Sequence, residues 1–127
     1  GLNEKRAQKD GIAYKVIEEF FADNDRALAE GETIGKIKIL LTPKGKPLGC
    51  QIIGSHAGDL IHEWVIAMAG SLKLSTIAGA VHIYPTLSEA SKRAAGQFFS
   101  GKIFSETTKK VLRFLFSLKG RACTPQS

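Results

Sequence analysis

A short turn between two apolar runs limits the folds that this chain can adopt. The runs cover residues 33–42 and 47–54, and the segment Pro43-Lys44-Gly45-Lys46 joins them. In the first run apolar and basic side chains alternate. The apolar ones are Ile37, Ile39 and Leu41, and the basic ones are Lys36 and Lys38. A period of two residues is typical of a strand with one buried face, and proline and glycine favour a reversal of the chain. The sequence therefore predicts an antiparallel hairpin whose second strand is the more buried one.

Two segments before the hairpin also have a regular character. Residues 3–9 are good helix formers, with Asn3 at the N-cap position. Residues 12–21 are rich in β-branched and aromatic residues, which favours a strand. Residues 22–31 are polar and contain the breaker Asn24, so they indicate a connection.

Residues 57–72 change to a helical period. Their apolar residues recur at positions i, i+1, i+4, i+5 and i+8, which is the stripe of an amphipathic helix. The stripe consists of Leu60, Ile61, Trp64, Val65 and Met68. We therefore expect a helix here that packs on the sheet, with Trp64 and Met68 in the core.

The segment that follows this helix leads to a proline. Residues 71–79 indicate an irregular or single-turn connection, and residues 80–84 an extended segment, because Pro85 disfavours the α conformation at the residue before it. Thr86 and Glu89 then have the spacing of a capping box, in which each side chain bonds the other residue's backbone N–H. A helix is therefore expected to follow.

The helix after the capping box is predicted over residues 87–99, and Gly101 is expected to interrupt it. A last helix is predicted over residues 105–118. The predicted strands cluster in the sequence instead of alternating with helices. This order is typical of an α+β fold, an antiparallel sheet covered by helices.

Length and composition indicate one ordinary globular domain of 127 residues. The chain begins with Gly1 and its single methionine is Met68, which suggests a fragment of a longer protein. Cys50 lies in an apolar run and Cys123 near the end, so the two cysteines do not form a disulfide framework. Cys50 is expected to be a small core residue, and a cytoplasmic location is the simplest interpretation.

The net charge of +6 raises the question of a nucleic-acid partner. Residues 1–100 hold 12 Lys and Arg against 11 Asp and Glu, a net charge of +1, whereas residues 101–127 hold 6 against 1, a net charge of +5. The basic character therefore belongs to the end of the chain, and no recognition-helix or basic-aromatic pattern accompanies it. We do not expect a nucleic-acid binder.

The sequence lacks the common motifs of a self-contained enzyme. It has no G-x-G-x-x-G after a strand, no P-loop, no C-x-x-C pair and no G-x-S-x-G elbow. Its three histidines, His56, His62 and His82, are not spaced as metal ligands. No cofactor, metal or nucleophile of its own is therefore expected in this chain.

Two stretches resemble a known family. Residues 49–61 read GCQIIGSHAGDLI, and residues 82–90 read HIYPTLSEA. In this order, about 20 residues apart, they resemble the C-terminal dimerisation domain of the pyridine nucleotide-disulfide oxidoreductases, which include dihydrolipoamide dehydrogenase, glutathione reductase and mercuric reductase. The weaker segment 1–7 resembles the start of that domain. The resemblance covers residues 1–100 and implies the same α+β fold.

The resemblance also implies a function within a larger parent protein. In this family FAD and NAD(P) are bound by two preceding domains, and the dimerisation domain pairs with its copy in a homodimer. One loop completes the partner subunit's active site beside the flavin. Carried over, Tyr84 and Glu89 are the candidate catalytic residues, and Pro85 and Thr86 lie near the partner's flavin. The Tyr84–Pro85 bond is expected to be cis.

One departure from the family pattern concerns Tyr84, which stands where the disulfide reductases carry a catalytic histidine. A phenol with a pKa near 10 cannot serve as a thiol base near neutral pH. In having a tyrosine at this position, the sequence resembles mercuric reductases. It lacks the paired terminal cysteines of those enzymes. The parent is therefore predicted to be mercuric-reductase-like.

Simpler interpretations of the same residues stay open at this point. Tyr84 could pack at an interface, and Glu89 could serve only as a helix cap. His82, two residues before Tyr84, would share its face in an extended segment and could replace the missing base, although a hydrogen-bonded structural histidine is the favoured interpretation. The alternative function is a free-standing oligomerisation or binding module with the same fold.

The basic segment, residues 101–127, lies beyond the resemblance. On a helical wheel its apolar residues fill one arc and its basic residues the other. One interpretation is a helix that packs on the domain with its basic face in water. The other is an interfacial helix on an anionic membrane, which would give the parent a peripheral membrane contact.

Overall fold

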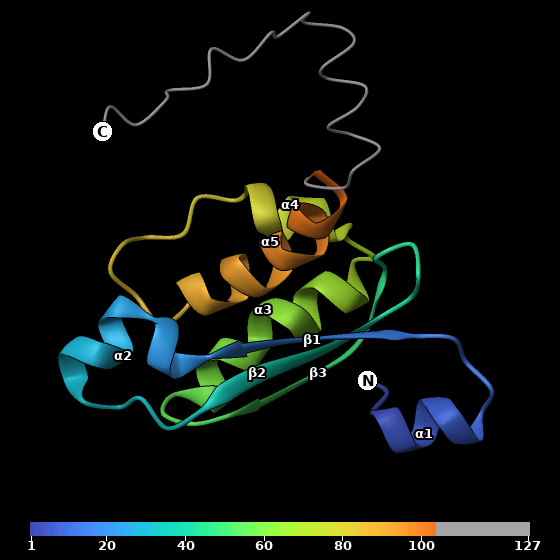
Figure 1. The fold of residues 1–127 in the computed structure, drawn as a ribbon, viewed down its shortest axis with the longest axis horizontal. Coiled ribbons are helices and arrows are strands. Elements are labelled where there is room, and N and C mark those ends of the chain that lie inside the picture. The colour runs from blue at the N-terminus through green and yellow to red at the C-terminus, as the bar shows by residue number, and fades with distance from the viewer. Residues whose placement is uncertain (104–127) are drawn as a thin grey trace, which may run out of the picture.

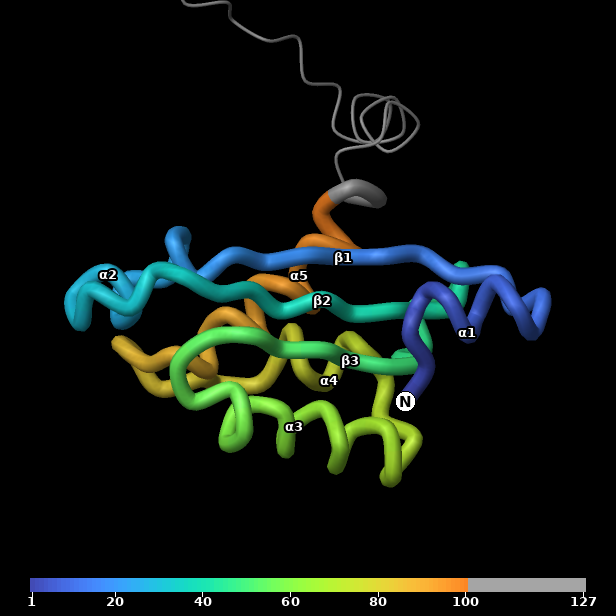
Figure 2. The backbone as a smooth tube through the Cα atoms, turned by 90° about the horizontal axis from the view of Figure 1, so that it is seen from below, coloured from blue at the N-terminus to red at the C-terminus, as the bar shows by residue number. Residues whose placement is uncertain are grey.

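In a computed structural model of the chain, the described residues are 1–103. Three strands, β1 (Lys15–Phe20), β2 (Lys36–Leu41) and β3 (Pro47–Ile53), form an antiparallel sheet in the order β1-β2-β3. Helices α3, α4 and α5 cover one face of this sheet, and α1 lies against one end of the other face (Figures 1 and 2). The predicted α+β class is confirmed.

The hairpin forms at the residues where the alternating pattern predicted it. Thr42 N donates to Lys46 O at 2.8 Å, and Gly45, at a φ of +90°, donates to Thr42 O at 2.9 Å. Ile37, Ile39 and Leu41 are fully buried, as predicted. The prediction that the second strand is the more buried one is wrong. β2 has a neighbouring strand on each side, whereas β3 lies at the sheet edge with Ile53 68% exposed.

β1 begins three residues after the start of the predicted strand over 12–21. It ends one residue before the predicted end, because the chain enters a 3-10 turn at Phe21, η1 (Phe21–Asp23). The predicted connection over 22–31 contains a helix, α2 (Asp25–Glu30). Asn24 is its N-cap, with Oδ1 accepting from Ala27 N at 3.0 Å. A residue interpreted as a breaker therefore starts a helix.

Helix α1 (Glu4–Lys9) confirms the prediction for residues 3–9, and Asn3 caps it by accepting from Arg6 N at 2.9 Å. An ion pair links α1 to the sheet, with Glu4 Oε2 and Lys38 Nζ 2.9 Å apart. The hydrogen bond to Glu4 raises the pKa of Lys38, and Glu18 adds to this effect. The basic face of β2 is therefore covered in part by α1.

Helix α3 (Ala57–Ala69) packs against β3 and the core. Trp64 is fully buried, and Leu60 and Met68 are partly buried against the core, as the stripe predicted. Val65 departs from the prediction because it is 47% exposed, and its neighbour Ile66 is 65% exposed. Within the described residues, α3 thus has a second apolar face that points to solvent.

The connection predicted over 71–79 holds a short helix, α4 (Leu74–Gly79), whose Leu74 and Ile77 enter the core. α5 (Glu89–Ile103) begins two residues later than predicted, because residues 87 and 88 form a turn. It also continues through Gly101, so the predicted interruption there is wrong.

Three predictions concern residues outside the described part of the chain. They are the helix over 105–118, the place of Cys123 and the membrane contact of the basic segment. In the part of the chain that is described, none of the helices has the length and apolar character needed to cross a membrane.

Candidate functional site

The loop between α4 and α5, residues 80–88, carries three of the four candidate site residues, Tyr84, Pro85 and Thr86, and Glu89 follows it at the start of α5. It runs along the outside of the helical layer and meets α2 (Figure 1). The Tyr84–Pro85 bond is cis, as expected. Val81, Ile83 and Tyr84 are 87%, 70% and 66% exposed. The loop therefore presents apolar and aromatic side chains to solvent in this single subunit.

Three consecutive residues at the start of α2 hold this region. Asp25 Oδ2 accepts from the Tyr84 hydroxyl at 3.1 Å, and Asn24 Nδ2 donates to Thr86 O at 3.1 Å. The backbone carbonyl of Asp23 accepts from Arg93 of α5. The segment Asp23–Asp25 thus contacts both the loop and the helix that follows it. The sequence did not indicate these contacts, because residues 22–31 were interpreted as a connection, although Asn24 followed by Asp25 is itself a helix-start signal.

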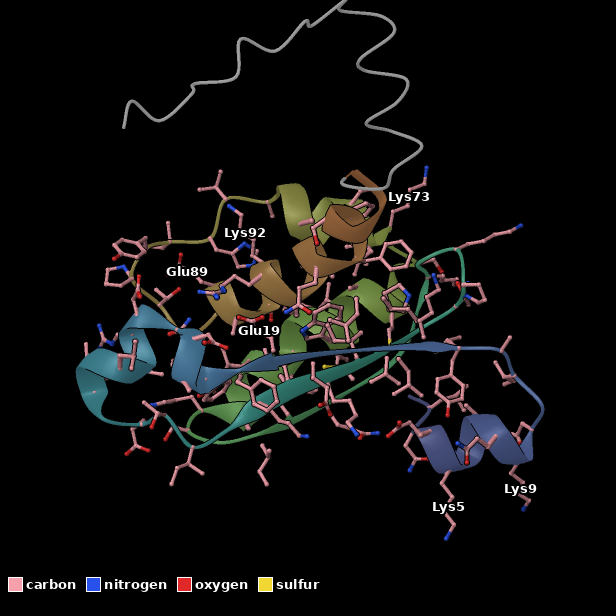
Figure 3. The ribbon with its side chains drawn as sticks, in the orientation of Figure 1. Lys5, Lys9, Glu19, Lys73, Glu89 and Lys92 are labelled. Atoms are coloured by element: carbon pink, nitrogen blue, oxygen red, sulfur yellow. The ribbon has the colours of Figure 1, made fainter. Side chains whose placement is uncertain are left out.

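Glu89 is the first residue of α5, and Figure 3 shows it beside the loop. Its Oε2 accepts from Thr86 N at 3.4 Å, which is one half of the predicted capping box. The Thr86 hydroxyl does not complete the box: it donates to Ile83 O at 2.6 Å and lies 2.7 Å from Ser88 Oγ. Glu89 therefore serves as a helix cap, and a second role at an active site stays a prediction.

The surroundings of Tyr84 favour its neutral form. The hydrogen bond to Asp25 raises the pKa of the Tyr84 phenol, and the negative charge of Asp25 and, more weakly, that of Glu89 act in the same direction. Tyr84 is a protonated phenol near neutral pH. This agrees with the expectation that it cannot replace histidine as a thiol base.

His82 and Tyr84 do not share a face as predicted. His82 Nε2 lies 2.9 Å from Glu63 Oε1 on α3, and Nδ1 lies 3.2 Å from Ala80 O. Its side chain is 8% exposed, whereas Tyr84 turns to α2. The loop is not a regular strand, so the two-residue alternation does not apply. The structural interpretation of His82 fits this geometry.

A buried acidic residue ties α5 to the sheet. Glu19 on β1 is 4% exposed, and its Oε1 lies 2.7 Å from Arg93 Nε. Gln97, one turn further along α5, donates to Glu19 Oε2. Figure 3 shows Glu19 between α5 and the sheet. Because Arg93 also bonds the carbonyl of Asp23, this cluster sets the position of the helix that begins with Glu89.

Pro85 and Thr86, the predicted flavin neighbours, line a surface hollow of about 380 Å³. Arg26 of α2 and His56, which precedes α3, line it as well. No three His, Cys, Asp or Glu side chains in residues 1–103 are grouped as metal ligands. The loop, α2 and the start of α3 therefore line the same hollow.

Cys50 was predicted to be a small core residue, and in the structure it is partly buried against the core. It packs against the hydrophobic core, and burial raises its pKa to about 12. Thiolate is the form that reacts with alkylating agents, so a rise from an ordinary value near 8.5 lowers the reactive fraction ~10³-fold. A Cys123→Ser chain is expected to react with iodoacetamide at pH 8 at least ~10²-fold more slowly when folded than in denaturant, followed by mass spectrometry. Equal rates in both conditions would contradict the buried assignment.

The arrangement of sheet and helices also occurs in known structures, and this likeness concerns the fold. The fold is similar to LpdA from Mycobacterium tuberculosis, with a TM-score of 0.71 and 22% identity over 77% of this chain and 22% of that chain. It is also similar to the HOCl-induced flavoprotein disulfide reductase RclA from Escherichia coli, with a TM-score of 0.71 and 21% identity over 76% of this chain and 22% of that chain.

The family follows from the sequence match. A family model described as the pyridine nucleotide-disulphide oxidoreductase dimerisation domain matches residues 1–95, and the chain belongs to this family. It is 42% identical over 86 residues to dihydrolipoyl dehydrogenase 2, chloroplastic, of Arabidopsis thaliana, covering 67% of this chain and 15% of the relative. It is 39% identical over 95 residues to the mitochondrial dihydrolipoyl dehydrogenase of Sus scrofa, covering 74% of this chain and 19% of the relative.

These matches confirm the resemblance of residues 49–61 and 82–90 to this family. The chain spans less than a fifth of the length of these two curated relatives. The division of the chain near residue 100 and the roles of Tyr84, Pro85, Thr86 and Glu89 stay predictions.

Proposed function

We propose that this chain is the C-terminal part of an FAD- and NAD(P)-dependent oxidoreductase, that it pairs with a second copy of itself, and that its loop completes the partner subunit's active site. FAD and NAD(P) would be bound by domains outside this chain and would supply the electron transfer. The observation that carries the proposal is the exposed loop, which is nevertheless held in place at Tyr84 and Thr86 by hydrogen bonds to α2.

An apolar surface next to the loop supports the pairing. Val65 and Ile66 of α3 are exposed, and so are Val81 and Ile83 of the loop. The bond between His82 and Glu63 holds the loop against α3, where Ile66 lies three residues after Glu63 on the same side of the helix. Exposed apolar side chains that lie on neighbouring elements are typical of a protein interface. A two-fold dimer would bury the same surface on both copies.

The identity of Tyr84 supports the finer proposal, a mercuric-reductase-like parent. The relatives described above are dihydrolipoyl dehydrogenases, yet the resemblance places a tyrosine where their class carries a catalytic histidine. A neutral phenol bonds a substrate without removing a thiol proton. We therefore propose an electron acceptor that is not a dithiol substrate, and a cytoplasmic parent, which the free Cys50 thiol supports.

Replacement of Tyr84 by phenylalanine in the complete parent protein tests this function. We expect kcat for NAD(P)H oxidation with the parent's acceptor to fall by about 10²-fold, the lower end of the contribution of a positioned proton-transfer or hydrogen-bonding group. Flavin content and dimer mass should stay unchanged, because the ring of Tyr84 is 66% exposed and contributes little to the core.

The matched control is Tyr14→Phe, which removes the other tyrosine hydroxyl. That hydroxyl accepts from Gln8 Nε2 at 2.8 Å, at the opposite end of the sheet from the loop, and its loss should leave kcat unchanged. Equal kcat for the Tyr84→Phe and unmutated proteins would contradict the proposed role of the loop.

A further inference from the structure

The Tyr84 hydroxyl has a partner that sequence patterns did not indicate. Asp25, the first residue of α2, lies 59 positions earlier and accepts the phenol proton at 3.1 Å. The contact does not rest on one flexible side chain. Asn24, next to Asp25, is 2% exposed and bonds both Ala27 N and Thr86 O. The carboxylate of Asp25 therefore projects from a fixed helix start toward a loop that is tied to the same point.

We propose that Asp25 is a positioning residue for Tyr84. Asp25 holds the phenol proton, so that the lone pairs of the Tyr84 oxygen point outward. Tyr84 then binds its ligand as a hydrogen-bond acceptor. A tyrosine hydroxyl has one proton to donate and two lone pairs that accept. When the proton points to Asp25, the solvent-exposed side of the Tyr84 oxygen carries the lone pairs. The inference rests on the proposed function, since it names what this loop presents to the partner's active site.

The charges around Tyr84 define the class of ligand that it would take. Asp25 from α2 and Glu89 from α5 are the groups whose charges act on the phenol, and both are acidic. Arg26, which follows Asp25, is already paired with Glu30, with 2.5 Å between Nη2 and Oε1. Two carboxylates behind a neutral acceptor disfavour an anion and favour a proton donor or a cation. The ligand class is therefore a metal cation or a neutral hydrogen-bond donor, and not a thiolate or carboxylate.

The raised pKa of Tyr84 supports this geometry. Its largest cause is the hydrogen bond to Asp25, followed by the charge of Asp25. An acceptor that holds the phenol proton in this way makes ionisation of Tyr84 harder. Removal of the Asp25 charge should consequently make the phenol easier to ionise.

The test is an absorbance titration of tyrosinate in the 127-residue chain with Tyr14→Phe, which leaves Tyr84 as its single tyrosine. We expect Tyr84 to titrate above the ordinary tyrosine pKa, and the added substitution Asp25→Asn to shift the titration to lower pH. Asp23→Asn is the matched control. It removes the same charge two residues away, but Asp23 holds Arg93 through its backbone carbonyl, so the Tyr84 titration should not move.

Two outcomes would overturn the positioning role. One is the same titration midpoint with and without Asp25→Asn, and the other is an equally large shift in Asp23→Asn. If Asp25→Asn does not fold by circular dichroism, Asp25→Glu keeps the carboxylate, and Tyr84 must still titrate above the ordinary range in that chain. A midpoint at the ordinary value there would overturn the proposal.

The titration needs neither flavin nor turnover, so its result is separate from the proposed function. A lowered midpoint in Asp25→Asn, together with an unchanged kcat in Tyr84→Phe, would support the contact and contradict the catalytic setting. An unchanged midpoint in Asp25→Asn, together with a reduced kcat in Tyr84→Phe, would contradict the role of Asp25 but not the proposed function.

Discussion

Replacement of Ile66 by glutamate is expected to convert the chain from a dimer to a monomer. Ile66 lies on α3, is 65% exposed in the single subunit, and adjoins Val65, which is 47% exposed. In a two-fold dimer it would be buried on both copies, so the substitution places two unpaired carboxylates in one apolar interface. Substitutions at the centre of an interface cost roughly 2 kcal/mol or more, which raises Kd by about 30-fold. Sedimentation velocity over a dilution series measures the change.

Leu28→Glu is the matched control for this experiment. Leu28 on α2 is 55% exposed, and α2 lies on the β1 side of the sheet, across from α3 (Figure 2). The same apolar-to-acidic change should leave Kd within a factor of about three there, since exposed substitutions away from an interface change free energies by roughly 0.5 kcal/mol. A dimer in Ile66→Glu that is as tight as in the unmutated chain would show that α3 is not the interface.

Replacement of Trp64 by alanine is expected to cause a large loss of stability. Trp64 is fully buried in the core between α3 and the sheet, and its Nε1 donates to Ser91 Oγ of α5 at 3.0 Å. Truncation of a buried aromatic residue to alanine lowers the free energy of unfolding by roughly 3–5 kcal/mol. The change also leaves the Ser91 hydroxyl buried without its donor. Urea unfolding at fixed protein concentration, followed by circular dichroism, measures the loss.

Two further variants separate packing from hydrogen bonding at this position. Trp64→Phe keeps most of the volume but removes the bond to Ser91, and we expect a loss of about 1–3 kcal/mol. Adding Ser91→Ala should recover part of that loss, because the unsatisfied hydroxyl is removed as well. A loss below about 1 kcal/mol in Trp64→Ala would contradict the assignment of Trp64 to the core.

The sequence predicts those parts of the fold that depend on local period. The alternation of Ile37, Ile39 and Leu41 is enough to place the hairpin, because it sets the buried face whatever the neighbours are. It does not reveal that β3 lies at the sheet edge, since strand order depends on which strands pair. Helix α2 was missed because Asn24 was interpreted as a breaker and not as an N-cap. Helix α4 was predicted only as an irregular or single-turn connection, because its six residues are too few for a clear apolar stripe.

The candidate site shows the same division. Tyr84, Pro85, Thr86 and Glu89 lie within one loop and the helix start after it, so a local motif identifies them together. Asp25 contacts Tyr84 across 59 positions of sequence, and no local pattern reports a contact of that range. The acidic partner of Tyr84 consequently required the structure.

Sedimentation equilibrium of the unmutated 127-residue chain tests most directly whether this domain pairs with its own copy. At tens of micromolar we expect a single species of twice the 13.7 kDa subunit mass, and the same for a chain cut after Ser100. A species at 13.7 kDa throughout this concentration range would contradict the account.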